Sequence, residues 1–239
     1  MSALSVDRLN VRIQAAHVIQ GVSLAVPEGK TLALVGHNGV GKTTLVRTIM
    51  GLTGGIFSGS IVYGDLNLTH LPGWERPKAG LCYVPQSRRI FPSLTVEEHL
   101  LVATRPARYG TRAWKAQDMY DLFPNLAARR QQRGGLSGGE QQMLAIARAL
   151  MGNPKTVILD EPTEGLSPAM VGRVLSTLQQ IKGEGISILL VEQDIKFVAA
   201  LADSVCVQSA GRIVWQGHEI GEADIARALS ASSGLEIGA

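Results

Sequence analysis

Short apolar runs along the chain, each followed by polar or glycine residues, predict buried β-strands. Residues 31–35, 81–84, 156–159 and 186–191 are apolar almost throughout, rather than alternating with polar residues. Continuous apolar runs of this length are typical of strands that a parallel sheet covers on both faces. Residues 1–35 are rich in β-forming residues, which predicts further strands in this part of the chain, before the strand at 31–35. Additional strands are expected at about 60–63, 204–208 and 212–216, with Gly54, Gly55 and Gly59 marking loops around the first of them.

From about residue 90 to 150 the apolar residues change to helical spacing. Thr95 begins one helical segment, and Glu98 three residues later completes a capping-box pattern. A second strong helix is expected over residues 140–151. Other helices are expected directly after residue 44, from Ser167 and Pro168 to about 183–185, at about 195–202 and over the last ~20 residues.

Residues 36–44, which read Gly-His-Asn-Gly-Val-Gly-Lys-Thr-Thr, fit the pattern G-x-x-x-x-G-K-[ST]. The stretch joins the predicted strand at 31–35 to a predicted helix. Glycines let backbone N–H groups surround phosphate oxygens, and a helix N-terminus adds partial positive charge. Lys42 can reach β- and γ-phosphates, and the hydroxyl of Thr43 can hold Mg²⁺. The residues expected to bind the nucleotide are Gly36, His37, Asn38, Gly39, Val40, Gly41, Lys42, Thr43 and Thr44.

The strand pattern and this loop together predict an α/β fold. We expect a P-loop NTPase core with a β-rich N-terminal subdomain and an inserted α-helical subdomain. A single domain would span residues 1–239, which is an ordinary size for one compact unit. Its core would comprise residues 1–89 and 151–239, with the helical insert at about 90–150.

Polar side chains follow three of the predicted strands, at Gln86, at Asp160 and Glu161, and at Gln193. Ligands bind beyond the carboxyl ends of parallel strands, so these residues are expected at the same edge as the loop. Asp160 suits a Mg²⁺ ion, held directly or through water, and Glu161 suits a general base for water attacking a γ-phosphate. Gln86 could order water or Mg²⁺. The alternatives are a solvated acidic pair at a strand end and an ordinary turn glutamine.

Ser137, Gly138 and Gly139 stand at the start of the helix predicted from residue 140. Such a helix start can form a second anion cradle, and the alternative is a simple N-cap by Ser137. One γ-phosphate needs only one such anion-binding helix start, and the chain has a first one at loop 36–44. A head-to-tail pair of domains would resolve this, with residues 137–139 of one copy facing loop 36–44 of the other across a shared ATP.

Composition narrows the function classes further. A net charge of +3 and only 5% aromatic residues argue against nucleic-acid binding. No apolar run approaches the ~18 residues that span a bilayer, and no signal-peptide pattern opens the chain, so a cytoplasmic location is expected. Cys82 and Cys206 are expected to be buried free thiols. The basic stretch 129–133 is interpreted as a solvated face, with a membrane surface or a partner's loop as alternatives.

The order and spacing of these motifs resemble the ATP-binding cassette (ABC) family over nearly the whole chain. The loop at 36–44 matches the phosphate-binding motif, and Gln86 matches the Q-loop. LSGGE at 136–140 matches the signature motif, and VILDE at 157–161 matches the second acidic motif. Agreement of several motifs in the right order is highly specific.

The resemblance implies an ATPase in which two ATP molecules, with Mg²⁺, lie between two paired cassettes. Glu161 would be the base, and residues 137–139 would act in trans. The implied partners are a second cassette, either a paralogue or another copy, two transmembrane permease subunits and, indirectly, a substrate-binding protein. The chain would be peripheral on the inner face of the cell membrane. A groove on this chain that receives the permease subunits is expected near Gln86 and residues 87–105. Phe91 and Leu94 are either exposed apolar contacts in this groove or part of the core of the helical insert.

Within the family, the chain is more similar to ATP-binding subunits that power uptake of branched-chain or hydrophobic amino acids, or of urea and amides. A soluble cassette ATPase acting on ribosomes or DNA is an alternative, but such relatives usually carry a second cassette, a coiled coil or zinc-binding cysteines. A GTPase should show N-K-x-D, which this sequence lacks. The segments that carry the closer likeness are 83–86, 90–98, 160–168 and 191–193.

Three positions depart from the family pattern. Gln193 stands in place of the usual switch histidine; glutamine can hydrogen-bond a γ-phosphate but cannot carry a proton. The place of the adenine-stacking aromatic falls near Ile13, and the usual D-loop aspartate is Ser167. The subgroup that the chain resembles often has glutamine at the switch position, so a working ATPase is expected. The expected catalytic residues are Lys42, Glu161 and Gln193, and the expected metal site comprises Thr43, Gln86 and Asp160.

Overall fold

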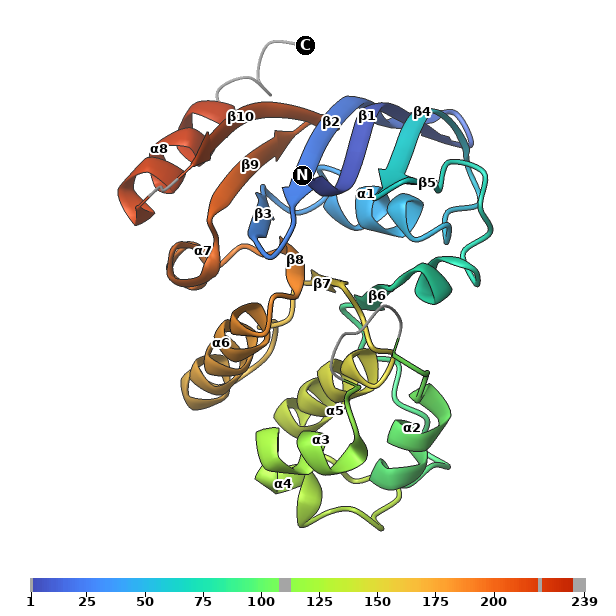
Figure 1. Cartoon of the computed structure of the whole chain (residues 1–239). Helices are drawn as coiled ribbons and strands as arrows, with labels where there is room; N and C mark the ends of the chain where they lie inside the picture. Colours follow the sequence, from blue (N-terminus) through green and yellow to red (C-terminus); the bar gives the residue numbers. More distant parts are fainter. Residues whose placement is uncertain (1, 108–112, 219–220, 234–239) are drawn as a thin grey trace.

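Two β-sheets and the helices packed on them make up the structure. The computed structural model describes residues 2–107, 113–218 and 221–233 (Figure 1). The larger sheet has the strand order β10-β9-β3-β8-β7-β6, and the smaller one has the order β2-β1-β4-β5. The predicted α/β class, with a β-rich N-terminal part and a helical region, is therefore confirmed.

In the larger sheet every neighbouring pair is parallel except β9 and β10, which are antiparallel. All residues of β3, β7 and β8 are buried, as the continuous apolar runs predict. The strands are β3 (Thr31–Val35), β6 (Leu81–Val84), β7 (Thr156–Asp160), β8 (Ser187–Val191), β9 (Ser204–Ser209) and β10 (Arg212–His218).

Alternate residues of the central strands enter two different cores. Leu32 and Leu34 of β3 belong to a core shared with the smaller sheet and with α1 (Lys42–Ile49). Ala33 and Val35 belong to the core on the opposite face, which most of the other helices cover. Because both faces are filled, β3 has one register, and the loop that follows Val35 has a fixed starting point.

The smaller sheet is antiparallel and contains β1 (Ser2–Ile13), β2 (Ala16–Pro27), β4 (Ile56–Tyr63) and β5 (Leu66–Asn67). The predicted start of β4 at residue 60 was wrong, because Gly59 lies inside the strand and not in a loop. Gly59 has φ +100°, and the β1–β4 register shifts beside it. Glycine here marks a β-bulge, where a Cβ would stand 2.5 Å from the carbonyl oxygen of Arg8.

Four helices gather at the end of the molecule away from α1 (Figure 1). They share one continuous core with β6, β7 and β8, so they have no separate interior. The exact bounds of the helical insert stay a prediction. These four are α2 (Val96–Ala103), α3 (Ala116–Leu122), α4 (Pro124–Ala127) and α5 (Gly138–Leu150); the others are η1 (Arg76–Ala79), α6 (Pro168–Gly183), α7 (Ile195–Leu201) and α8 (Glu222–Ser233).

Two of the predicted helix starts can be checked atom by atom. The Thr95 hydroxyl accepts the N–H of Glu98 at 3.1 Å, and the Glu98 carboxylate accepts the N–H of Thr95 at 2.7 Å, so the capping box is confirmed. Ser167 is the N-cap residue of α6 and Pro168 follows it, as expected. The side chain of Ser167, however, makes no capping hydrogen bond.

The basic stretch 129–133 is exposed but paired with carboxylates of its own domain. Arg129 lies 3.0 Å from Glu140, Arg133 lies 3.3 Å from Glu98, and Arg130 forms an ion pair with Glu97. This agrees with the interpretation of a solvated face.

Cys82 and Cys206 are both free and buried, and burial raises the pKa of each thiol to about 12. The prediction of buried free thiols is confirmed, and thiols of this kind are unreactive at neutral pH. Among the described residues, no helix combines the length and apolar character needed to cross a membrane.

One arginine is buried behind the helix that follows the phosphate loop. Arg76 is only 2% exposed. Its guanidinium donates to the carbonyl oxygens of Thr48 at 2.9 Å, of Ile49, and of Leu71 at 3.0 Å. The last carbonyls of a helix have no partner within it, so Arg76 satisfies the C-terminus of α1.

Replacing Arg76 with Met keeps the apolar length but removes every donor. We expect Arg76→Met to lower the free energy of unfolding by about 1–3 kcal/mol, because buried carbonyl oxygens, among them that of Ile49, lose the donor that Arg76 supplies. Lys78→Met in the same short helix is the control: Lys78 is half exposed, so its loss should change stability by about 0.5 kcal/mol or less. Urea unfolding of both variants measures this. Equal effects from the two variants would contradict the assigned role.

Candidate functional site

The loop before α1 closes around its own lysine. Gly41 precedes the helix with φ 105°, which favours glycine, and a Cβ on Gly36 would stand 2.3 Å from the carbonyl oxygen of Gln208. The Lys42 side chain is 4% exposed, and its Nζ donates to the carbonyl oxygens of Gly36 at 2.8 Å and His37 at 2.9 Å. The loop therefore holds a buried ammonium group at the N-terminus of a helix.

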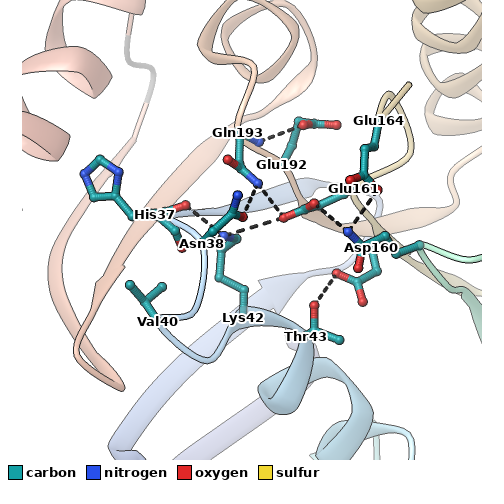
Figure 2. Close-up of polar contacts among 12 residues, drawn as sticks. His37, Asn38, Val40, Lys42, Thr43, Asp160, Glu161, Glu164, Glu192 and Gln193 are labelled. Atoms are coloured by element: carbon teal, nitrogen blue, oxygen red, sulfur yellow. Dashed lines mark hydrogen bonds and ion pairs between the residues drawn. The ribbon is translucent and has the colours of Figure 1, made fainter. Parts of the chain in front are cut away.

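The carboxylate of Glu161 is the point where the loop and the predicted strand ends meet (Figure 2). The Gln86 Nε2 donates to its Oε2 at 3.0 Å, and the Gln193 Nε2 donates to its Oε1 at 2.8 Å. The Lys42 Nζ lies 3.6 Å from Oε1. The prediction that these three strand ends share one edge with the loop is confirmed by these contacts.

The backbone of Glu161 adopts a positive φ angle that is rare for residues other than glycine. Glu161 is 7% exposed, its φ is +50°, and its N–H donates to the carbonyl oxygen of Val191 at 2.8 Å. Non-glycine residues rarely adopt positive φ, and where they do the surroundings must enforce it. Burial lowers the pKa of Lys42, and the nearby Glu161 carboxylate opposes that shift. The two groups are thus a close, buried pair of opposite charge.

Asp160 has a different set of neighbours from Glu161. Its two carboxylate oxygens accept the hydroxyl of Thr43 at 3.2 Å and the hydroxyl of Tyr83 at 2.9 Å. Burial raises the pKa of Asp160, and both hydroxyl hydrogen bonds oppose the rise. Burial likewise raises the pKa of Tyr83, which keeps it a hydroxyl donor.

Gln193 contacts the phosphate loop directly. Its Nε2 donates to Asn38 Oδ1 at 2.6 Å as well as to Glu161. Gln86 divides its amide in the same way, with a second hydrogen bond of 2.9 Å to Glu164 Oε2. Both amides therefore connect separate loops through the same buried carboxylate.

Three residues of this site were not expected from the sequence. Tyr83 reads as an ordinary strand residue, and only the alternation along β6 points its hydroxyl at Asp160. Glu164 and Glu192 lie within the segments that carry the family likeness, but no role in the site was predicted for either residue. Glu192 is 3% exposed, and burial raises its pKa. A carboxylate at the end of an apolar strand, beside Gln193, is the signal that could have identified it.

Within one chain, residues 137–139 do not lie at the edge of the sheet that carries the phosphate loop and Glu161. Ser137 and Glu140 form a capping box, in which the Ser137 hydroxyl accepts the Glu140 N–H at 3.3 Å and the Glu140 carboxylate accepts the Ser137 N–H at 2.8 Å. Helix α5 lies with α2, α3 and α4, apart from α1 (Figure 1). One chain thus shows the simple N-cap, and the role in trans stays a prediction.

Two further predictions concern exposed positions. Ile13 ends β1 and is 39% exposed, so its apolar surface faces outward; its packing on adenine stays a prediction. Ser167 is exposed before α6, and its effect on coupling between two sites also stays a prediction.

The residues present fit a magnesium nucleotide. Gly36 and Gly41 let the loop pack closely against Gln208, and a buried ammonium and a helix N-terminus supply positive charge. Thr43, Asp160 and Gln86 offer hydroxyl, carboxylate and amide oxygens, the hard ligands that Mg²⁺ takes. A cation would also favour the ionised form of the buried Asp160.

Comparison with known proteins agrees with this geometry. The ABC transporter family matches residues 19–164. The high-affinity branched-chain amino acid transport ATP-binding protein BraG of Pseudomonas aeruginosa is 38% identical over 92% of this chain and 94% of its own. The probable branched-chain amino acid transport ATP-binding protein LivF of Archaeoglobus fulgidus is 34% identical over 88% and 89%.

The crystal structure of MJ1267, an ATP-binding cassette of an ABC transporter in its ADP conformation, superposes with a TM-score of 0.83. Its identity is 26%, and the match covers 100% of both chains. The phosphate loop, the acidic pair and the full-length matches agree: the chain belongs to the ABC transporter family, as one of its ATP-hydrolysing cassettes.

Proposed function

We propose that the chain is the ATP-binding and ATP-hydrolysing subunit of an importer for branched-chain or hydrophobic amino acids. The observation that carries the catalytic part is the buried carboxylate of Glu161, surrounded by Lys42, Gln86 and Gln193. The importer class is supported by BraG and LivF, both named for branched-chain amino acid transport, which match this chain almost end to end. Import of urea or amides is the alternative.

Phosphate binding falls to the loop at 36–44. Lys42 now donates to carbonyl oxygens of its own loop, and these hydrogen bonds can be exchanged for phosphate oxygens at little cost. The N-terminus of α1 supplies backbone N–H groups and partial positive charge toward the same point. Thr43, Asp160 and Gln86 would hold Mg²⁺, which neutralises charge on the β- and γ-phosphates.

Glu161 would accept the proton of the attacking water. It lies beside Lys42 and within hydrogen-bond distance of two amides, so it is held in place without being protonated by them. Gln193 would donate a hydrogen bond to the γ-phosphate and orient the water. It cannot exchange a proton, so acid–base work rests on Glu161.

A second cassette would complete each site. Ser137, Gly138 and Gly139 begin α5 with their N–H groups at a helix N-terminus, away from the loop of the same chain. In a head-to-tail pair they would face the γ-phosphate bound by the partner. The partner is either a paralogue or a second copy of this chain. ATP would then favour the closed pair, and hydrolysis would reopen it.

The membrane permease subunits would dock in a groove of about 400 Å³ between η1, α2 and α5. Phe91 is 54% exposed there, so the alternative that it belongs to the insert's core was wrong. Its ring stacks on that of His99 with the centroids 5.9 Å apart, and the guanidinium of Arg148 lies over the Phe91 ring, 5.8 Å from its centroid. Leu94 is half-buried, and Val102 is 76% exposed at the rim. A short helical segment of a permease, with an apolar face and an acidic end, fits this lining.

The chain would thus sit peripherally on the inner face of the cell membrane, with a substrate-binding protein acting indirectly through the permeases. Direct action on nucleic acid is not supported by charge, since the basic stretch at 129–133 is already paired with carboxylates.

Changing Glu161 to Gln removes the base but keeps the size of the side chain and one acceptor oxygen. We expect ATP turnover to fall about 100-fold or more while ATP still binds. The variant should also form a dimer in the presence of Mg·ATP, measured as molar mass in solution. Asp194→Asn, a change of the same kind at the cap of α7, is the control. Turnover that survives in Glu161→Gln would show that another group activates the water.

A charge placed in the groove should block docking without affecting the nucleotide site. We expect Val102→Glu to lose at least about tenfold in the fraction of chain that sediments with membranes of its native host, because a carboxylate would be desolvated there. Val214→Glu makes the same change on exposed β10, outside the groove, and should bind like wild type. Equal membrane binding of both variants would place the permease elsewhere.

Uptake in cells tests the substrate class. In a strain deleted for this chain, radiolabelled leucine uptake should fall, and wild-type chain should restore it whereas Glu161→Gln should not. Urea uptake, measured in parallel, should be unchanged. Loss of urea uptake with normal leucine uptake would favour the alternative importer class.

A further inference from the structure

A second buried carboxylate stands immediately before Gln193, and each of its oxygens holds a different loop. One oxygen of Glu192 accepts the N–H of Gln193 at 2.7 Å and the N–H of Asp194 at 3.3 Å. The other accepts the hydroxyl of Thr163 at 2.7 Å and the N–H of Thr163 at 3.3 Å. Figure 2 shows Glu192 beside Gln193, on the far side from the phosphate loop.

These hydrogen bonds connect the two segments that carry the reacting groups. Thr163 lies two residues after Glu161, in the connection from β7 to α6, and Gln193 lies in the connection from β8 to α7. The backbone of Glu192 also donates to the carbonyl oxygen of Leu34, at the strand that leads into the phosphate loop. Glu192 therefore lies where three site-forming connections meet.

The chemistry of the position calls for a carboxylate. Four donors, three N–H groups and one hydroxyl, converge on one side chain that is 3% exposed. A carboxylate has about four acceptor positions on two oxygens, whereas a glutamine would turn an NH₂ group toward one pair of donors. Burying a charge is costly, so a buried carboxylate that makes only such hydrogen bonds needs a reason.

We propose that Glu192 and Thr163 form a positioning pair that fixes the switch residue Gln193 relative to Glu161. The pair does not touch the nucleotide; it acts through the backbone of Gln193, whose side chain is then held between Asn38 and Glu161. This inference rests on the proposed function, in which Gln193 contacts the γ-phosphate. The pair accordingly contributes to the preference for ATP over ADP.

The test measures binding and not turnover. In a Glu161→Gln background, which preserves bound ATP, the Kd values for Mg·ATP and Mg·ADP are determined for Thr163→Val and Thr163→Ser. Val keeps the shape but removes the hydroxyl that donates to Glu192. We expect Thr163→Val to weaken ATP binding about tenfold, as for one hydrogen bond to a charged group, with ADP binding within about twofold. Thr163→Ser should restore ATP binding.

Two controls separate positioning from general damage. Thr177→Val removes a buried hydroxyl that donates to Arg173 within α6, away from the site, and should leave both Kd values unchanged. In a Gln193→Ala background, Thr163→Val should weaken ATP binding no further, because the residue it positions is gone.

Three results would overturn the positioning role: equal weakening of ATP and ADP, full additivity with Gln193→Ala, or no effect of Thr163→Val. Failure of the proposed function would look different. The parent Glu161→Gln protein would then bind ATP weakly, or would keep its ATP affinity when Lys42 is changed to Ala.

Discussion

A carboxylate held out of water, that of Glu161, is the constraint on which this site depends. Removing such a group from water costs several kcal/mol unless nearby charge and hydrogen bonds compensate. For Glu161 the compensation comes from Lys42 at 3.6 Å and from the amides of Gln86 and Gln193. These groups follow three different strands besides its own, so the sheet must form before the carboxylate can be buried. The fully buried strands β3, β7 and β8 supply that fixed frame.

The helices α2 to α5 do not depend on the buried carboxylate of Glu161. The polar groups at the start of α5 are satisfied locally, by the reciprocal hydrogen bonds of Ser137 and Glu140. Nothing in that arrangement depends on Lys42 or Glu161. A folded chain therefore contains two glycine-rich helix starts, one before α1 and one at α5, and the local hydrogen bonds of each form without the other. If both contact one nucleotide, as proposed, a second cassette must supply one of them, and ATP binding would then favour pairing.

The sequence predicted the parts of this structure that depend on short-range patterns. Continuous apolar runs indicated parallel strands, and the rule that their carboxyl ends share an edge placed Gln86, Glu161 and Gln193 together. The capping box at Thr95 needed only residues three apart. These features are encoded within a few positions of the chain.

The missed features depend on contacts between distant residues. The hydroxyl of Tyr83 reaches Asp160 only because β6 and β7 pair in one register. Glu192 meets Thr163 across 29 residues, and no local pattern reveals that contact. Gly59 was assigned to a loop because glycine is typical of the turns between strands. In the structure it lies within β4, where a β-bulge against β1 requires glycine.

Adjacent acidic residues at the end of β7 acquire different chemistry from their neighbours alone. Asp160 faces two hydroxyl groups, and its pKa is raised by burial, so a cation bound beside Thr43 would favour its ionised form. Glu161 faces amides and an ammonium group, none of which can accept a proton from water. With glutamine at position 193, the switch loop can position groups by hydrogen bonds but cannot share the proton. In the proposed mechanism proton transfer would therefore rest on Glu161, and the surrounding loops hold that one carboxylate in place.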